Sequence, residues 1–101
     1  MKEYNKLVRD KIPEIITAKG GESVTHIASN EEYRQKVAEK LQEELAEFLD
    51  SKDPEELADL LEITYAVGES LGVSKEELEA MRVKKAKERG GFSKRIILER
   101  S

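Results

Sequence analysis

The fold is decided by residues 41–61, which read LQEELAEFLDSKDPEELADLL. Within this stretch, Asp53-Pro54-Glu55-Glu56 is a helix start signal, because aspartate can cap a helix, proline fits the first turn and acids favour its positive end. Apolar residues on both sides of this signal recur at helical spacing. The stretch therefore predicts two long helices, and the short link between them makes them antiparallel neighbours.

Capping and chain-breaking residues outside the hairpin bound these helices and predict a further one. Asn30 is the expected cap of the first long helix, which runs to about residue 50. Gly72 is expected to end the second. Ser74 and Glu77 have the spacing of a capping box and start a helix that continues as far as Gly90-Gly91. The chain from residue 30 onward is thus predicted to be largely helical.

Three shorter segments complete the chain. Residues 10–19 are expected to form a short helix capped by Asp10, and residues 23–28 and 95–99 are candidates for two short strands that pair with each other. The predicted fold class is mainly all-α: an antiparallel helical hairpin, resembling a four-helix bundle, with at most a small two-stranded β element. The length of 101 residues is that of one domain, so residues 1–101 are interpreted as a single domain.

The composition excludes several kinds of site. The chain has no cysteine and one histidine, so disulfides, zinc–thiolate sites, cysteine nucleophiles and multi-histidine metal sites within one chain are excluded. Charged residues make up 40% of the chain, and its apolar runs are too short to span a bilayer. We therefore expect a soluble, cytoplasmic protein with no membrane partner.

Charge is distributed unevenly along the chain. Residues 30–79 carry sixteen acidic and five basic side chains, whereas residues 80–101 carry eight basic and two acidic ones. One interpretation is that solvated helix faces pair with each other; the other is a metal site in the middle and an anion site at the end. The acidic middle would repel a phosphate backbone, so no nucleic-acid partner is expected.

Four carboxylates face each other when the hairpin is folded about its link. Glu47 then lies opposite Glu56, and Glu44 lies opposite Asp59, while each helix carries its own pair at a spacing of three residues. Four converging carboxylates would repel one another, and a hard cation such as Mg²⁺ takes oxygen ligands and would relieve that repulsion. The alternative is ordinary solvated helix surface. Lys40 projects near Glu62 and is expected to close the site with an ion pair.

Three blocks of the sequence resemble one superfamily. Glu43-Glu44-Leu45-Ala46-Glu47 followed by Glu56-Leu57-Ala58-Asp59 resembles the signature of the all-α nucleoside triphosphate pyrophosphohydrolases, which include the MazG proteins, phosphoribosyl-ATP pyrophosphohydrolases and dimeric dUTPases. Residues 4–13 and 87–96 resemble a small MazG-like subgroup, often labelled phosphoribosyl-ATP pyrophosphohydrolase-like. The eight residues between Glu47 and Glu56 are fewer than in many MazG proteins.

The resemblance implies an activity and roles for the acids. It implies hydrolysis of a nucleoside triphosphate between the α- and β-phosphates, which gives a monophosphate and pyrophosphate, with Mg²⁺ as cofactor or Mn²⁺ as its substitute. Glu43 is then the catalytic candidate, which orients or deprotonates the attacking water. The implied metal ligands are Glu44, Glu47, Glu56 and Asp59.

Basic residues would hold the phosphates of such a substrate. Gly90-Gly91 permits close approach of the backbone to an anion, and Phe92 beyond it is the candidate for contacting the base. The candidate phosphate-binding residues are Lys6, Arg9, Lys84, Lys87, Arg89 and Lys94.

Oligomeric state and two alternative functions complete the expectations. The long helices carry apolar residues on more than one side, and the family is typically oligomeric, so a homodimer or higher homo-oligomer is expected. One alternative is a catalytically inactive helical interaction or regulatory module. The other is the phosphoribosyl-ATP pyrophosphohydrolase of histidine biosynthesis, against which the subgroup-like blocks at both ends argue.

Overall fold

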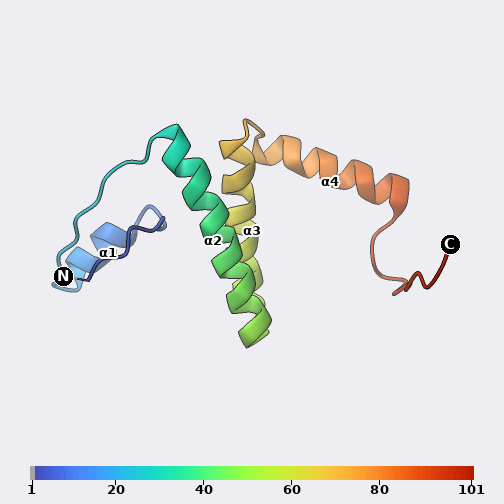
Figure 1. The fold of residues 1–101 in the computed structure, drawn as a ribbon, viewed down its shortest axis with the longest axis horizontal. Coiled ribbons are helices and arrows are strands. Elements are labelled where there is room, and N and C mark those ends of the chain that lie inside the picture. The colour runs from blue at the N-terminus through green and yellow to red at the C-terminus, as the bar shows by residue number, and fades with distance from the viewer. Residues whose placement is uncertain (1) are drawn as a thin grey trace.

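The computed structural model describes residues 2–101, and within them the chain forms four helices (Figure 1). They are α1 (Ile12–Ala18), α2 (Asn30–Ser51), α3 (Pro54–Ser70) and α4 (Lys75–Arg89). No strand occurs in residues 2–101. The predicted mainly all-α fold class is therefore confirmed, and it is realised without the small β element.

The two candidate strands do not form. Residues 23–28 and 95–99 have no regular structure, and their large apolar side chains, such as Val24 and Ile97, are 84% and 83% exposed. A strand is stable only when it pairs with another and buries one face. These two segments lie on opposite sides of the hairpin, so neither finds a partner (Figure 1).

The helix ends follow the capping signals closely. The Asp53 carboxylate accepts a hydrogen bond from the Glu55 amide at 3.0 Å, as predicted. Ser74 and Glu77 make the predicted capping box. The cap of α2 is Ser29 rather than Asn30, because the Ser29 hydroxyl accepts from the Glu32 amide at 3.1 Å.

The start of α1 differs from the prediction. Its cap position is Lys11, without a side-chain hydrogen bond, so Asp10 does not cap the helix. Pro13 still lies in the first turn, where its missing amide hydrogen costs nothing.

Helices α2 and α3 form the predicted antiparallel hairpin (Figure 1). Lys52, in the link, adopts the left-handed conformation, with φ 58°, and its amide bonds back to Phe48 at 2.8 Å. Val37 of α2 and Ile63 of α3 are the buried hydrophobic residues of the described chain, at 1% and 8% exposure. The core is therefore confined to the seam between these two helices.

The chain as a whole is extended. Its radius of gyration is 17.5 Å, whereas a compact chain of this length would have about 13 Å. Its accessible surface is 9156 Å², whereas a folded monomer of this mass would expose about 5,800 Å². Helix α4 leaves the end of α3 that is far from the link and points away from the hairpin (Figure 1).

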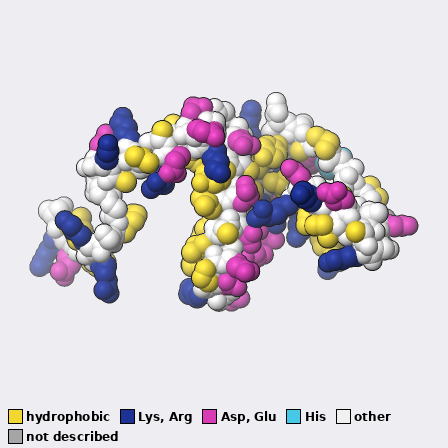
Figure 2. All heavy atoms as spheres, turned by 180° about the vertical axis from the view of Figure 1, so that it is seen from behind, with side chains coloured by type: hydrophobic (Ala, Val, Ile, Leu, Met, Phe, Trp, Pro, Cys, Tyr) yellow, Lys and Arg dark blue, Asp and Glu magenta, His cyan; other side chains and the backbone are white. Residues whose placement is uncertain are grey.

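Part of this extra surface is apolar. Figure 2 shows hydrophobic side chains along one edge of the hairpin and acidic side chains along the other. The exposed leucines of the hairpin, here called the leucine edge, are Leu45, Leu49, Leu57 and Leu61. Within the described residues, no helix is both long enough and apolar enough to cross a membrane.

Candidate metal centre

Three of the four predicted carboxylates meet at the seam of the hairpin. Glu44 of α2 and Glu56 and Asp59 of α3 offer oxygen atoms that all lie within 4.8 Å of one another. The hairpin fold accounts for this grouping: Glu44 borders the apolar stripe of α2, and Glu56 and Asp59 lie one turn apart on α3. We call this group the carboxylate trio.

Glu44 is the most constrained member of the carboxylate trio. It is 7% exposed, and its Oε1 lies 3.3 Å from Nζ of Lys40, one turn earlier on the same helix. Its Oε2 is buried and has no hydrogen-bond partner within residues 2–101. A buried carboxylate oxygen without a partner costs about 1–3 kcal/mol or more. This atom therefore marks a position at which a cation would be stabilised.

Glu47, the fourth predicted ligand, is exposed and lies outside the carboxylate trio. It nevertheless acts on the trio electrostatically. Partial burial, together with the negative charges of Glu47, Asp59, Glu44 and Asp53, raises the pKa of Glu56 above its ordinary value. The site therefore concentrates more negative charge than its surroundings neutralise.

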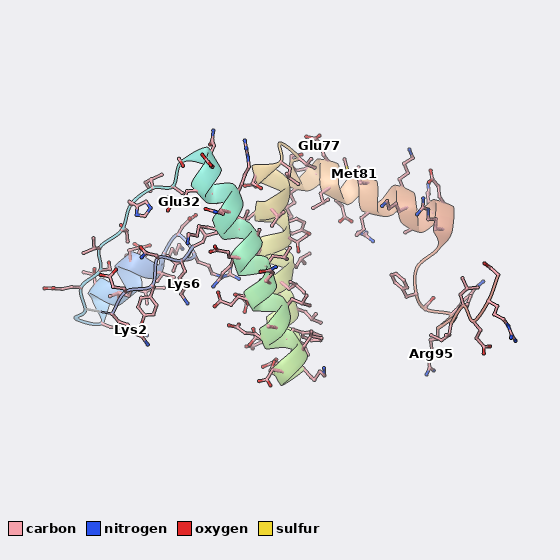
Figure 3. The ribbon with its side chains drawn as sticks, in the orientation of Figure 1. Lys2, Lys6, Glu32, Glu77, Met81 and Arg95 are labelled. Atoms are coloured by element: carbon pink, nitrogen blue, oxygen red, sulfur yellow. The ribbon has the colours of Figure 1, made fainter. Side chains whose placement is uncertain are left out.

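Two of the predicted phosphate-binding residues contact this acidic region. Nη2 of Arg9 donates to Oδ1 of Asp59 at 2.8 Å, and Nζ of Lys6 lies 3.8 Å from Oε1 of Glu43. Both come from the segment that precedes α1, and Figure 3 shows Lys6 between α1 and the hairpin. Glu43, the catalytic candidate, is thus adjacent to the carboxylate trio and has a cation nearby.

Lys40 pairs with a different acid from the one predicted. Its ammonium lies 3.3 Å from Glu44 and 3.9 Å from Glu43, whereas no ion pair with Glu62 forms within residues 2–101. A spacing of three or four residues along one helix favours such pairs, and that signal is present in the sequence.

The remaining predicted site residues are not brought to the carboxylate trio within one chain. Helix α4 starts at the end of the hairpin opposite the link and extends away from it, and the tail follows, as the position of Arg95 in Figure 3 shows. Phe92 is 97% exposed. The predicted residues on α4 and the tail are Lys84, Lys87, Arg89, Phe92 and Lys94.

A groove that adjoins the carboxylate trio was not predicted. It has a volume of about 710 Å³ and lies between the hairpin and the segment containing α1. Glu44, Asp59 and Arg9 line one part of it, and Tyr33 and Tyr65 line another. Burial and the charges of Glu69 and Asp10 raise the pKa of Tyr33. Helical spacing marks these tyrosines only as core residues, because the position of α1 has no local sequence signal.

Comparisons of the chain with protein-family models, with curated proteins and with solved structures find no match.

Proposed function

We propose that this protein hydrolyses nucleoside triphosphates to the monophosphate and pyrophosphate with the help of a divalent cation. The observation that carries the proposal is the carboxylate trio with its buried, unpartnered Glu44 oxygen. The sequence resemblance to the all-α pyrophosphohydrolases supports the same reaction. Cytoplasmic nucleotide pools would supply the substrate.

The carboxylate trio fits Mg²⁺ or Mn²⁺ in chemistry and in spacing. All its ligand atoms are carboxylate oxygens, which these hard ions prefer. Their oxygens lie within 4.8 Å of one another, so modest side-chain movements would bring them to the roughly 3.0–4.2 Å that separates ligands of octahedral Mg²⁺. Glu47 is near enough to influence Glu56 and is proposed as a further ligand. When bound, the ion would neutralise phosphate oxygens as negative charge develops on the leaving group.

The chain's own residues would supply the remaining chemistry. Glu43 makes only long contacts, at 3.8 Å to Lys6 and 3.9 Å to Lys40, so its oxygens are free to accept a proton from the attacking water. Lys6 and Arg9 would hold phosphate oxygens at the carboxylate end of the groove. Charge-assisted contacts of this kind are the strongest hydrogen bonds available to the site.

We also propose that the functional unit is a homodimer or a higher homo-oligomer. The accessible surface exceeds that expected for a monomer of this mass by about 3,300 Å². Obligate interfaces bury about 2,000–5,000 Å² in total, or about 1,000–2,500 Å² per chain, so a second copy covering the leucine edge would account for a large part of the excess. The cations of α4 and the tail, together with Phe92, would then reach the carboxylate trio of another chain.

A helical interaction module is the second candidate function. The exposed leucine edge favours it, because such surfaces bind partners. The unpartnered oxygen of Glu44 argues for the enzyme, because a binding module has no use for a buried carboxylate that lacks a partner.

The test is pyrophosphate release from a panel of nucleoside triphosphates, with and without Mg²⁺. Wild type should release pyrophosphate only with the ion, and Glu44→Gln should reduce turnover by about 100-fold or more. Glu39→Gln is the matched control, because Glu39 is also on α2 and pairs with a lysine, Lys36, outside the trio. If no nucleotide is hydrolysed although Mg²⁺ binds, the enzyme proposal fails in favour of the module.

A further inference from the structure

Arg9 contacts one carboxylate of the trio. Its guanidinium donates to Oδ1 of Asp59 at 2.8 Å across a separation of 50 residues. The same segment places Lys6 near Glu43. Each of these cations therefore neutralises an acid that the proposed reaction would need for the ion or for the water.

The contact can be exchanged readily. The side chains of Arg9 and Asp59 are 58% and 41% exposed, so water and ions reach the pair. Residues 2–9 form no helix or strand, and Asn5 turns the chain with φ 46°. Lys40 differs, because it lies one turn from Glu44 on the same helix, so its ammonium stays within reach of that acid whenever α2 is folded.

Arg9 and Lys40 each pair with one member of the carboxylate trio, but one buried oxygen remains without a partner in the described part of the chain. Arg9 bonds to Asp59, whereas Oε2 of Glu44, nine-tenths buried, has no partner within residues 2–101. The contact of Arg9 with Asp59 does not satisfy Oε2 of Glu44. A small divalent ion could satisfy Glu44, Glu56 and Asp59 together, and its positive charge would repel the guanidinium that Arg9 places on Asp59.

We infer that Arg9 is an exchangeable internal cation: it holds Asp59 in the metal-free protein, is released when a divalent ion binds the trio, and then binds phosphate. The inference rests on the proposed function in treating the trio as a metal site. It adds a linkage. The ion alone competes with Arg9, whereas the ion and a phosphate anion bind cooperatively, because the anion recovers the interaction that Arg9 loses.

Calorimetric titration of the full-length protein with Mg²⁺ alone, and with Mg²⁺ in the presence of inorganic pyrophosphate, tests this linkage. Arg9→Gln should bind Mg²⁺ alone about two- to fivefold more tightly than wild type, as expected for loss of a partly exposed competing pair. Pyrophosphate should increase Mg²⁺ affinity less in Arg9→Gln than in wild type. Arg9→Lys should lie between the two, because it keeps the charge but loses the forked geometry.

Arg82→Gln is the matched control, because Arg82 also pairs with an acid, Glu79, but on α4. It should bind Mg²⁺ as wild type does. Calorimetry measures binding directly, so this comparison is independent of activity.

The outcomes separate the two proposals. Equal or weaker Mg²⁺ binding by Arg9→Gln, or an unchanged effect of pyrophosphate, would overturn the inference and leave the proposed function standing. Absence of Mg²⁺ binding by wild type and by Arg9→Gln alike would overturn both.

Discussion

The acidic hairpin and the basic end of the chain are organised in opposite ways. In the hairpin, Glu44, Glu56 and Asp59 converge within 4.8 Å across a link that immediately follows Ser51. In α4 and the tail, cations line an exposed helix and an irregular segment, and Phe92 is 97% exposed. Carboxylates that are close in sequence are assembled by the hairpin, whereas the distant cations of α4 and the tail are not brought to the trio within the described chain.

In the proposed site, the acidic hairpin would bind the metal ion, and the basic residues of α4 and the tail would bind phosphate. Acids that repel one another can be held close together by packing between two helices, and here Val37 and Ile63 are the buried residues of that packing. Basic residues on a helix end are favoured there by the helix dipole, even without a ligand. The acidic hairpin and the basic residues of α4 can therefore be tested separately, by variants that change one of them at a time.

Removing one acid from the trio should have the largest effect. Glu56→Gln is expected to lower turnover by about 100-fold or more, because it weakens stabilisation of the charged transition state. The metal-free fold should survive, since the variant removes a carboxylate that its neighbours repel. Pyrophosphate release and circular dichroism measure the two effects. Unfolding of Glu56→Gln would contradict the metal-site interpretation.

Removing a cation from α4 should have the next largest effect. If Arg89 holds phosphate, Arg89→Ala is expected to lose about 1.5–3 kcal/mol of binding or transition-state stabilisation, about a tenfold to hundredfold loss of kcat/KM. If Arg89 only complements the helix dipole, turnover stays unchanged and stability falls by about 0.3–1 kcal/mol. Mg²⁺ affinity without nucleotide should hardly change in either case.

Mixing Glu56→Gln with Arg89→Ala decides whether Glu56 of one chain and Arg89 of another contribute to the same site. Random reassociation of Glu56→Gln with Arg89→Ala should give half heterodimers, each with one intact site, and thus about one quarter of wild-type activity. No recovery after confirmed subunit exchange would mean that both residues act in the same chain.

Disrupting the leucine edge should separate the chains. Leu61 is 52% exposed on the hairpin, and Leu61→Arg would place a charge in the proposed interface. We expect dimer dissociation to become at least about tenfold more favourable, since burying an unpaired charge costs well over one kcal/mol. Sedimentation or light scattering measures it. Val24→Arg, at an 84% exposed position outside the hairpin, should leave association unchanged.

The pH dependence of stability should show the smallest effect. Because the pKa of Glu56 is raised in the folded protein, the folded state binds more protons than the unfolded state between the ordinary and the raised pKa. The contribution of Glu56 to stability should therefore fall as pH rises through that window and then level off, whereas Glu79, whose pKa is lowered by Arg82, contributes in the opposite direction. The decrease in stability with rising pH should be smaller in Glu56→Gln than in wild type. Mg²⁺ should reduce the decrease in wild type. Melting temperatures in chelator between about pH 4 and pH 7 provide the test.

The sequence predicted the features that depend on local signals. The caps at Asp53 and Ser74 and the short link were enough to define the hairpin and to bring Glu44 opposite Asp59. Folding the sequence about the link predicts which residues of the two helices lie opposite each other, but not how each helix is rotated about its axis. It therefore did not distinguish the exposed Glu47 from the buried Glu44.

Features that depend on distant parts of the chain were not predictable in this way. The contact of Arg9 with Asp59 spans 50 residues and follows from the position of a segment without secondary structure. The candidate strands at residues 23–28 and 95–99 had suitable composition, but a strand requires a pairing partner, and composition does not supply one. The groove beside α1 arises in the same way from tertiary placement.

The short link also has a consequence for folding kinetics. Residues that pack across the hairpin are near one another in the chain, so closing the loop costs little entropy and local helical contacts form in microseconds to milliseconds. The pairing of Arg9 with Asp59, and the proposed association of chains, would follow. Refolding should therefore show a fast phase independent of protein concentration, in which most helical signal returns. Activity should return in a later phase that accelerates as the protein concentration increases.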